Sequence, residues 1–196
     1  VLVVDDGSSD RTADLVRDRA EAIVRADERP DLELLTVPHG GKGAAVRAGI
    51  IDKLERLATR PMLPETPAAA AIAASLEYVW ACSAFAADAC LRDEGLLEWL
   101  ATQGRLLEPA DAAWYAQTAD VVTLPGSHDD AVFMSALRIF RRRQLVRIAW
   151  RDLAGYAPIE QVLAELSWLA DACINVACRQ AAALLGARHG VPKDRN

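Results

Sequence analysis

The chain has 196 residues, of which 52% are hydrophobic, and a formal net charge of −6. These values are typical of a folded globular protein and exclude global disorder. The acidic charge argues against a nucleic-acid partner, because nucleic-acid-binding surfaces are usually basic. The sequence has no apolar run near the roughly 18 residues that suggest a membrane helix. We therefore expect a cytoplasmic protein with no membrane span.

The first 50 residues predict a β-α-β-α unit of the nucleotide-binding type. Residues 1–4 form a β-branched apolar run typical of a buried parallel strand, and residues 12–26 have helical spacing. Residues 32–37 predict a second strand, and a glycine-rich turn then leads into a helix at Ala44. Because Val1 already lies within an apolar strand, we expect the natural chain to begin upstream.

Polar residues follow the first predicted strand, where open α/β sheets bind ligands. Asp5 is a candidate to accept hydrogen bonds from a nucleobase or ribose. The alternative is that these residues cap the next helix, which is the role we expect for Ser8, Ser9 and Asp10. Asp6 fits either role.

The strings VLVVDDGSSDRTADLV and VPHGGKGAAVRAGI resemble family 2 glycosyltransferases of the GT-A type, which transfer sugars from nucleotide diphosphate donors. The resemblance covers about a quarter of the chain and implies that Asp5 and Asp6 contact the nucleotide-sugar, with Lys42 and Gly43 nearby. The metal-binding Asp-x-Asp of that family is absent from the sequence. The glycine-rich turn is not a P-loop, because Thr36 replaces the first glycine and Gly43 replaces the Ser or Thr.

Residues 51–67 contain the end of a helix and a linker with three prolines, and residues 68–196 predict an all-α region. We thus expect domains at 1–50 and 68–196, and a predominantly helical chain. The one strand signal after the linker is weak, at residues 121–124. The helices are expected at residues 68–92, 94–103, 109–119, 129–154 and 158–188.

The four cysteines indicate neither a metal site nor disulfides. They lie within predicted helices among small and apolar residues, without the C-x-x-C spacing of zinc sites. Cysteine is often buried, and a cytosolic protein keeps its thiols reduced. We expect buried, reduced thiols at Cys82, Cys90, Cys173 and Cys178.

The predicted helix at 129–154 has an apolar stripe of Phe133, Leu137 and Phe140. Its spacing matches a helix face, as does that of Leu163, Leu166 and Ala170 in the following helix. We expect these two stripes to pack together and to organise the helical region.

The same helix carries six arginines, which is unusual in an acidic chain. They indicate either binding to a phosphate or a partner, or a solvated face with intramolecular ion pairs. The candidates for phosphate or partner contact are Arg141, Arg142, Arg143 and Arg147.

Three further strings resemble the N-terminal region of the glutamine synthetase adenylyltransferase and adenylyl-removing enzyme: VWACSAFAADACLRDEGLLEWL, FMSALRIFRRRQLVRIAWRDLAG and LAELSWLADACINVACRQAAALLGARHGVPKD. The resemblance implies transfer of AMP from ATP to glutamine synthetase, or its removal, with Mg²⁺ as cofactor. The acidic metal-binding strand of this family would follow the region that matches residues 190–194.

The leading hypothesis is therefore a partial adenylyltransferase of nitrogen metabolism, fused to a glycosyltransferase remnant. We expect it to be inactive alone, with no catalytic residue or metal ligand in this chain. A nucleotide-sugar-dependent glycosyltransferase is one alternative. A non-catalytic helical module that docks an acidic partner through its arginines is another.

Overall fold

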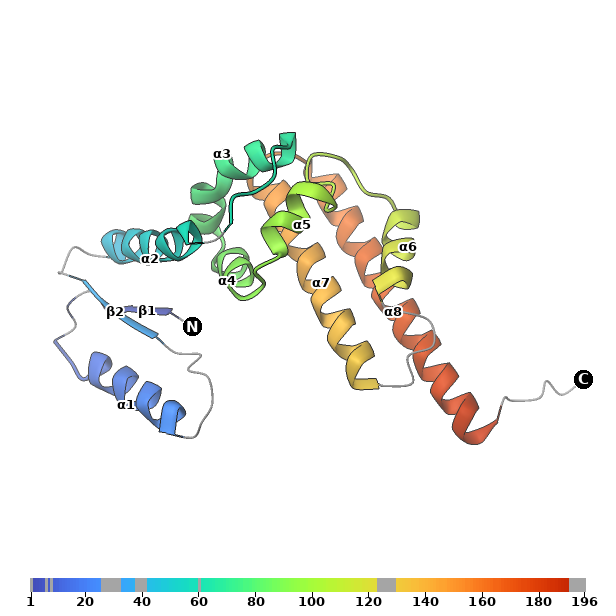
Figure 1. Ribbon diagram of the computed structural model, residues 1–196, viewed down its shortest axis with the longest axis horizontal. Helices are drawn as coiled ribbons and strands as arrows, with labels where there is room; N and C mark the ends of the chain where they lie inside the picture. Colours follow the sequence, from blue (N-terminus) through green and yellow to red (C-terminus); the bar gives the residue numbers. More distant parts are fainter. Residues whose placement is uncertain are drawn as a thin grey trace, which may run out of the picture. The chain divides into compact units, whose positions relative to one another are not determined.

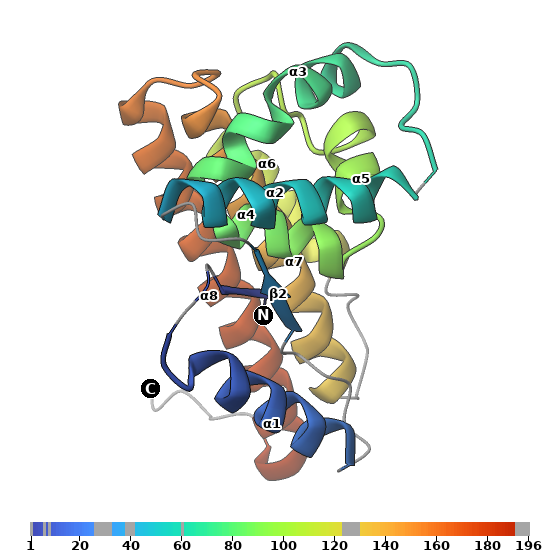
Figure 2. The ribbon, with the colours of Figure 1, turned by 90° about the vertical axis from the view of Figure 1, so that its left-hand side faces the viewer.

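The computed structural model describes residues 2–5, 7, 9–25, 33–37, 42–59, 61–122 and 130–190. It is mostly helical with one two-stranded sheet, which confirms the predicted fold class (Figures 1 and 2). The elements are β1 (Leu2–Asp5), α1 (Thr12–Arg25), β2 (Glu33–Thr36), α2 (Lys42–Ala58), α3 (Pro67–Cys82), α4 (Ala84–Arg92), α5 (Leu96–Thr102), α6 (Ala112–Val122), α7 (Asp130–Leu153) and α8 (Ile159–His189).

The chain forms two compact units, and the boundary between them does not coincide with the predicted linker. The first comprises residues 1–63 and 74–94, and the second comprises residues 64–73 and 95–196. A compact unit is defined by packing, whereas the boundaries predicted from the sequence are based on resemblance. The domain boundaries at 1–50 and 68–196 remain predictions.

In the first unit, β1 and β2 form a parallel pair, as predicted. The register pairs Leu2 with Glu33 and Asp5 with Thr36, and the Val37 amide donates a hydrogen bond to the Asp5 carbonyl at 2.9 Å. The helix α1 contacts β2, and α2 contacts β1. The strand pair thus lies between these two helices, as Figure 2 shows.

The helix α4 also belongs to the first unit, where it packs against α2. The Lys53 ammonium of α2 donates a hydrogen bond to the Asp88 carboxylate of α4 at 2.8 Å, and both side chains are largely shielded from solvent. This ion pair joins residues from either side of the proline-rich segment.

Side-chain caps explain where helices begin. The Asp10 carboxylate accepts a hydrogen bond from the Thr12 amide at 2.9 Å, which confirms the capping role predicted for Asp10. The single helix predicted at 68–92 is wrong, because Ser83 has an extended backbone and its hydroxyl accepts a hydrogen bond from the Ala86 amide at 3.2 Å. Serine competes with the backbone for hydrogen bonds and therefore favours helix starts over helix interiors.

The helix α6 begins later than predicted and runs further. The Asp111 carboxylate accepts a hydrogen bond from the Trp114 amide at 2.8 Å, so that the helix starts at Ala112. It continues to Val122, so the weak strand predicted at 121–124 is wrong for its first two residues, and the other two lie outside the described residues.

In the second unit, α7 and α8 pack side by side along much of α7, and α6 packs against both (Figure 1). The buried core of this bundle includes the predicted apolar stripe of α7, since Phe133 and Phe140 are buried and Leu137 is partly buried. Its buried members are Ala110, Tyr115, Ala119, Phe133, Phe140, Ile148, Val162, Leu169, Ala172 and Val176.

The face predicted for α8 is wrong. Leu163 is 58% exposed, Leu166 is 39% exposed, and Ala170 is exposed as well. The helix instead buries the adjacent stripe of Val162, Glu165, Leu169, Ala172 and Val176. A charged residue in the middle of this stripe hides its apolar periodicity in the sequence.

All four cysteines are free. Cys90 is buried and Cys173 is partly buried, but Cys82 and Cys178 are exposed, so burial was wrongly predicted for two of them. Within the described ranges, no single helix is long and apolar enough to cross a membrane. The pair α3 and α4 meets that test only when combined, and it is bent by 119°.

Candidate functional site

The predicted nucleotide site has one described side chain. Asp5 is 5% exposed at the carboxyl end of β1, and Lys42 and Gly43 begin α2, which contacts β1. Asp6 lies outside the described residues, as do the side-chain surroundings of Lys42 and Gly43. The structure therefore places three of these residues on neighbouring elements, and nucleotide-sugar binding stays a prediction.

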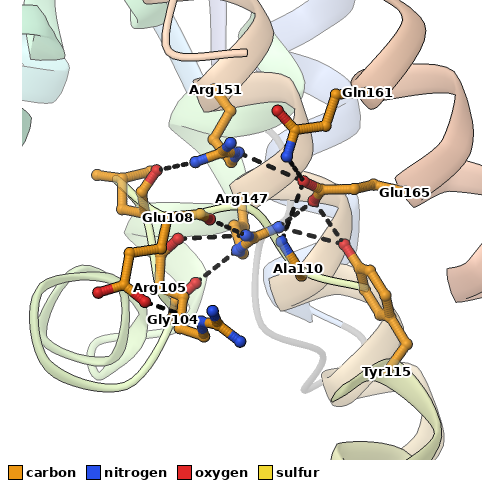
Figure 3. Close-up of polar contacts among 10 residues, drawn as sticks. Gly104, Arg105, Glu108, Ala110, Tyr115, Arg147, Arg151, Gln161 and Glu165 are labelled. Atoms are coloured by element: carbon orange, nitrogen blue, oxygen red, sulfur yellow. Dashed lines mark hydrogen bonds and ion pairs between the residues drawn. The ribbon is translucent and has the colours of Figure 1, made fainter. Parts of the chain in front are cut away.

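A buried polar cluster lies instead in the interior of the second unit, with Arg147 of α7 at its centre (Figure 3). Arg147 is fully buried. Its guanidinium donates to the carboxylate of Glu165 on α8 and to the hydroxyl oxygen of Tyr115 on α6, the latter at 3.2 Å. The Tyr115 hydroxyl in turn donates to Glu165 at 2.9 Å. One ion pair thus connects all three helices of the bundle.

Arg147 also fixes the turn that precedes α6. Its guanidinium donates to the carbonyls of Gly104 at 2.5 Å, Arg105 at 3.2 Å and Glu108 at 2.8 Å. Arg105 adopts a left-handed backbone with φ of 48°, which is unfavourable for a non-glycine residue. A side chain at Gly104 would come within 2.9 Å of the Leu100 backbone, so the close approach requires glycine.

Glu165 receives further donors, so that its negative charge is well compensated. The Gln161 amide donates to it at 3.2 Å and the Ala110 backbone amide at 3.5 Å. The Arg151 guanidinium lies 3.6 Å from the carboxylate and donates to the Leu106 carbonyl at 2.6 Å. Two buried arginines therefore share one buried glutamate. Arg147 uses backbone carbonyls for its other donors, whereas the Arg151 Nε has no hydrogen-bond partner among the described residues.

Burial sets the ionisation of this cluster. Burial raises the pKa of the Tyr115 phenol above its usual value, and the nearby Arg147 charge opposes that change only in part. Burial and the neighbouring Arg147 charge lower the pKa of Arg151. Because desolvating charges is costly unless they are paired and hydrogen-bonded, this closed cluster has the properties of a structural core.

The structure separates the four arginines predicted to contact a phosphate or partner. Arg147 is wrongly placed in that set, because it is fully buried and bound to Glu165 and backbone carbonyls. Arg143 lies over the Trp99 ring, with its guanidinium carbon 5.9 Å from the ring centre. Arg141 is exposed and Arg142 is half-buried, so these two remain candidates.

A separate pocket of about 270 Å³ lies between α6 and α8. An ion pair between Asp120 of α6 and Arg179 of α8 lies on its wall, and its remaining lining is mostly small and apolar, with Asn175 and Cys178. The carboxylate and the guanidinium already bind each other. The pocket therefore has no free charged group with which to orient a ligand.

Neither the Arg147–Glu165 cluster nor the pocket between α6 and α8 has the side chains that metal-assisted phosphoryl transfer requires. Within the described part of the chain, no three His, Cys, Asp or Glu side chains lie close enough to hold a metal ion. Glu165, the central carboxylate, is already bound by two arginines. The residues that the structure describes therefore do not fit Mg²⁺.

Sequence reasoning missed Glu165, Tyr115 and the role of Arg147, although one signal was available. Phe133, Phe140 and Arg147 are each seven residues apart, which places the arginine on the same helix face as the buried aromatics. Likewise Glu165 is three residues after Val162. A charged residue within each apolar stripe indicates a buried pair.

Comparison with known proteins identifies the family. The family model for glutamate-ammonia ligase adenylyltransferase matches residues 73–196, which is more than half of the chain. The chain belongs to this family. The match confirms the resemblance predicted for the helical region, and no solved structure matches the chain.

Three curated relatives are named bifunctional glutamine synthetase adenylyltransferase/adenylyl-removing enzyme. The chain is 39% identical over 120 residues to the protein of Thioalkalivibrio sulfidiphilus, covering 61% of this chain and 12% of the relative. For the protein of Nitrosococcus oceani the identity is 40% over 103 residues, which is 53% of this chain and 10% of the relative. For the protein of Pseudomonas aeruginosa the identity is 39% over 100 residues, which is 51% of this chain and 10% of the relative. The chain thus spans about a tenth of the length of these relatives.

Proposed function

We propose that residues 73–196 form the N-terminal helical region of an enzyme that transfers AMP from ATP to glutamine synthetase and removes it again, in the cytoplasm. Family membership is the observation that carries this proposal. The names of the three relatives, at 39% to 40% identity, supply the reaction and the partner. The enzyme would act in the control of nitrogen metabolism.

The region contributes a rigid scaffold to that enzyme, and the chain alone is inactive. Its buried polar cluster is closed, because Arg147, Glu165 and Tyr115 bind one another through their polar atoms. The sequence also lacks the Asp-x-Asp that holds metal ions in this chemistry. ATP and Mg²⁺ would bind to other parts of the intact enzyme.

A segment exchange tests the proposal. The matching segment of the Thioalkalivibrio sulfidiphilus relative is replaced by residues 73–196, and AMP incorporation into glutamine synthetase is measured with ATP and Mg²⁺. We expect the exchanged enzyme to transfer AMP and the chain alone to transfer none. The control is an exchange with an unrelated helical segment of equal length. A folded but inactive exchange, or AMP transfer by the chain alone, would contradict the proposal.

A second candidate function concerns residues 1–50, which we propose to be a remnant of a family 2 glycosyltransferase. The supporting observation is a buried carboxylate, Asp5, at the carboxyl end of a parallel strand, where α/β sheets bind nucleotides. Titration with UDP-glucose tests it, with Asp5→Ala as the variant. Binding that the variant loses would support a retained nucleotide site, whereas equal binding or none would contradict it. We expect no sugar turnover.

A further inference from the structure

Three arginines of α7 remain unused by the internal network. Arg138 and Arg141 are exposed and Arg142 is half-buried. None of them forms a hydrogen bond or ion pair with any residue that the structure describes. They lie three and four residues apart, which places them on one side of the helix. We call Arg138, Arg141 and Arg142 the basic stripe.

The adjacent side of α8 exposes aliphatic side chains. Ile159, Leu163 and Ile174 are 56%, 58% and 60% exposed, and Leu166 is 39% exposed. They recur at helical spacing beside the buried face, and we call these four residues the apolar stripe.

The basic and apolar stripes border each other. Burial raises the pKa of the Cys173 thiol on α8, and the Arg141 charge opposes that change in part. The packing of α8 gives the same arrangement. α6 lies against the side of α8 that carries Asn175 and Arg179, whereas the partly buried Cys173 lies on the opposite side, seven residues after Leu166 and on the same helix face. The helices α7 and α8 pack side by side (Figure 1). The hairpin therefore presents exposed guanidinium groups on α7 next to exposed aliphatic side chains on α8.

This combination of side chains is suited to a protein partner with carboxylates. Arginine is enriched at protein interfaces and binds carboxylates through paired hydrogen bonds. Clustered exposed aliphatic groups mark interaction surfaces. The three positive charges lie on one side of α7 without a partner among the described residues, and an acidic partner would reduce the repulsion between them. The net charge of −6 makes a nucleic acid a poor partner.

We propose that the basic and apolar stripes form one docking face for an acidic protein surface, and that this surface belongs to glutamine synthetase. The choice of glutamine synthetase rests on the proposed function. On this proposal, the basic stripe steers and orients the partner, and the apolar stripe contributes buried area. A second copy of the chain is the competing occupant.

Binding of purified glutamine synthetase to the immobilised full chain tests the docking face. The double variant Arg138→Glu/Arg141→Glu reverses two charges of the basic stripe and is expected to weaken binding by about tenfold or more. The control, Arg19→Glu/Arg47→Glu, makes the same change at exposed arginines of α1 and α2 and is expected to bind like wild type. Leu163→Ser/Ile174→Ser should also weaken binding, but should keep its salt dependence.

Each outcome decides the proposal. Absence of binding by the wild-type chain, equal binding by the Arg138/Arg141 variant, or equal loss in the control would overturn it. Self-association of the chain that the Arg138/Arg141 variant abolishes, with binding to glutamine synthetase unchanged, would assign the face to a second copy and overturn it too. The segment exchange reports separately on the proposed function, because AMP transfer by the exchanged enzyme can persist when this docking face plays no part.

Discussion

The strand pair of the first unit and the helical bundle of the second satisfy their polar groups in different ways. In the bundle, Glu165 is enclosed by donors from α6, α7 and the turn before α6, so that every buried charge has a partner of opposite sign. In the strand pair, the sheet consists of β1 and β2 alone among the described residues. A two-stranded sheet is marginal by itself, whereas a closed polar core resists opening.

The largest effect is expected from Glu165→Ala, which leaves Arg147 and Arg151 buried without a counter-charge. Removing one partner of a buried ion pair typically costs about 3 to 5 kcal/mol. The loss of the hydrogen bond from Tyr115 adds to that cost. The measurement is urea unfolding, with exposed Glu160→Ala on the same helix as control. Similar free energies of unfolding for the two variants would mean that the buried cluster contributes little.

A loss of stability nearly as large is expected from Phe140→Ala, which tests the apolar part of the same core. Phe140 is 3% exposed, and truncating a buried phenylalanine costs about 3 to 5 kcal/mol. Arg142→Ala, on the outer side of α7, should change stability by less than about 0.5 kcal/mol. Thermal melts of both variants are the measurement. An equally large loss from the arginine variant would show that the basic stripe is engaged within the chain.

These two variants also mark what the sequence could predict. The spacing of Phe133 and Phe140 predicted the buried face of α7 correctly, because both residues are apolar. On α8 the same reasoning chose Leu163 over Glu165, because burial of a carboxylate depends on Arg147, which is 18 residues away in the chain. Long-range pairing of charges is not visible in local periodicity.

The candidate site shows the same limit. The arginine-rich helix was predicted, but not its division into buried arginines and an exposed stripe. That division follows from where the turn at residues 104–108 presents its carbonyls to Arg147. The break at Ser83 was missed for a simpler reason, since a serine between two apolar runs is consistent with either one helix or two.

Hydrogen exchange compares the two regions directly. Amides of β1 and β2 should open with a free energy at least about 2 kcal/mol below that of amides in the middle of α7 and α8, because strand edges without partners open locally. The amide of Val37, which donates a hydrogen bond to the Asp5 carbonyl, should exchange at a rate similar to that of the strand amides. Equal protection in strands and helices would remove the contrast between the two regions.

Gln144→Leu is expected to stabilise the chain. Gln144 is fully buried on α7, and neither its amide nitrogen nor its carbonyl oxygen has a hydrogen-bond partner among the described residues. An unsatisfied buried polar group costs about 1 to 3 kcal/mol, so an apolar residue of similar size should recover about 1 to 2 kcal/mol. Urea unfolding measures the gain, with exposed Gln117→Leu as control. Destabilisation by Gln144→Leu would show that the amide is bound in solution.

The smallest effect is a pH dependence that Tyr115 gives to the bundle. Burial raises its pKa in the folded state, so above about pH 10, the usual value for tyrosine, the unfolded chain loses this proton before the folded chain does. The unfolded state then binds fewer protons, and stability falls as the pH rises.

At neutral pH, Tyr115→Phe should be less stable than wild type by about 1 kcal/mol, because a hydrogen bond to Glu165 is lost. One pH unit above the unfolded pKa corresponds to about 1.4 kcal/mol, so the difference between the two proteins should shrink by about 1 kcal/mol between pH 8 and pH 11. Urea unfolding at both pH values gives that difference, and a constant difference would mean that the buried phenol does not couple the bundle to alkaline pH.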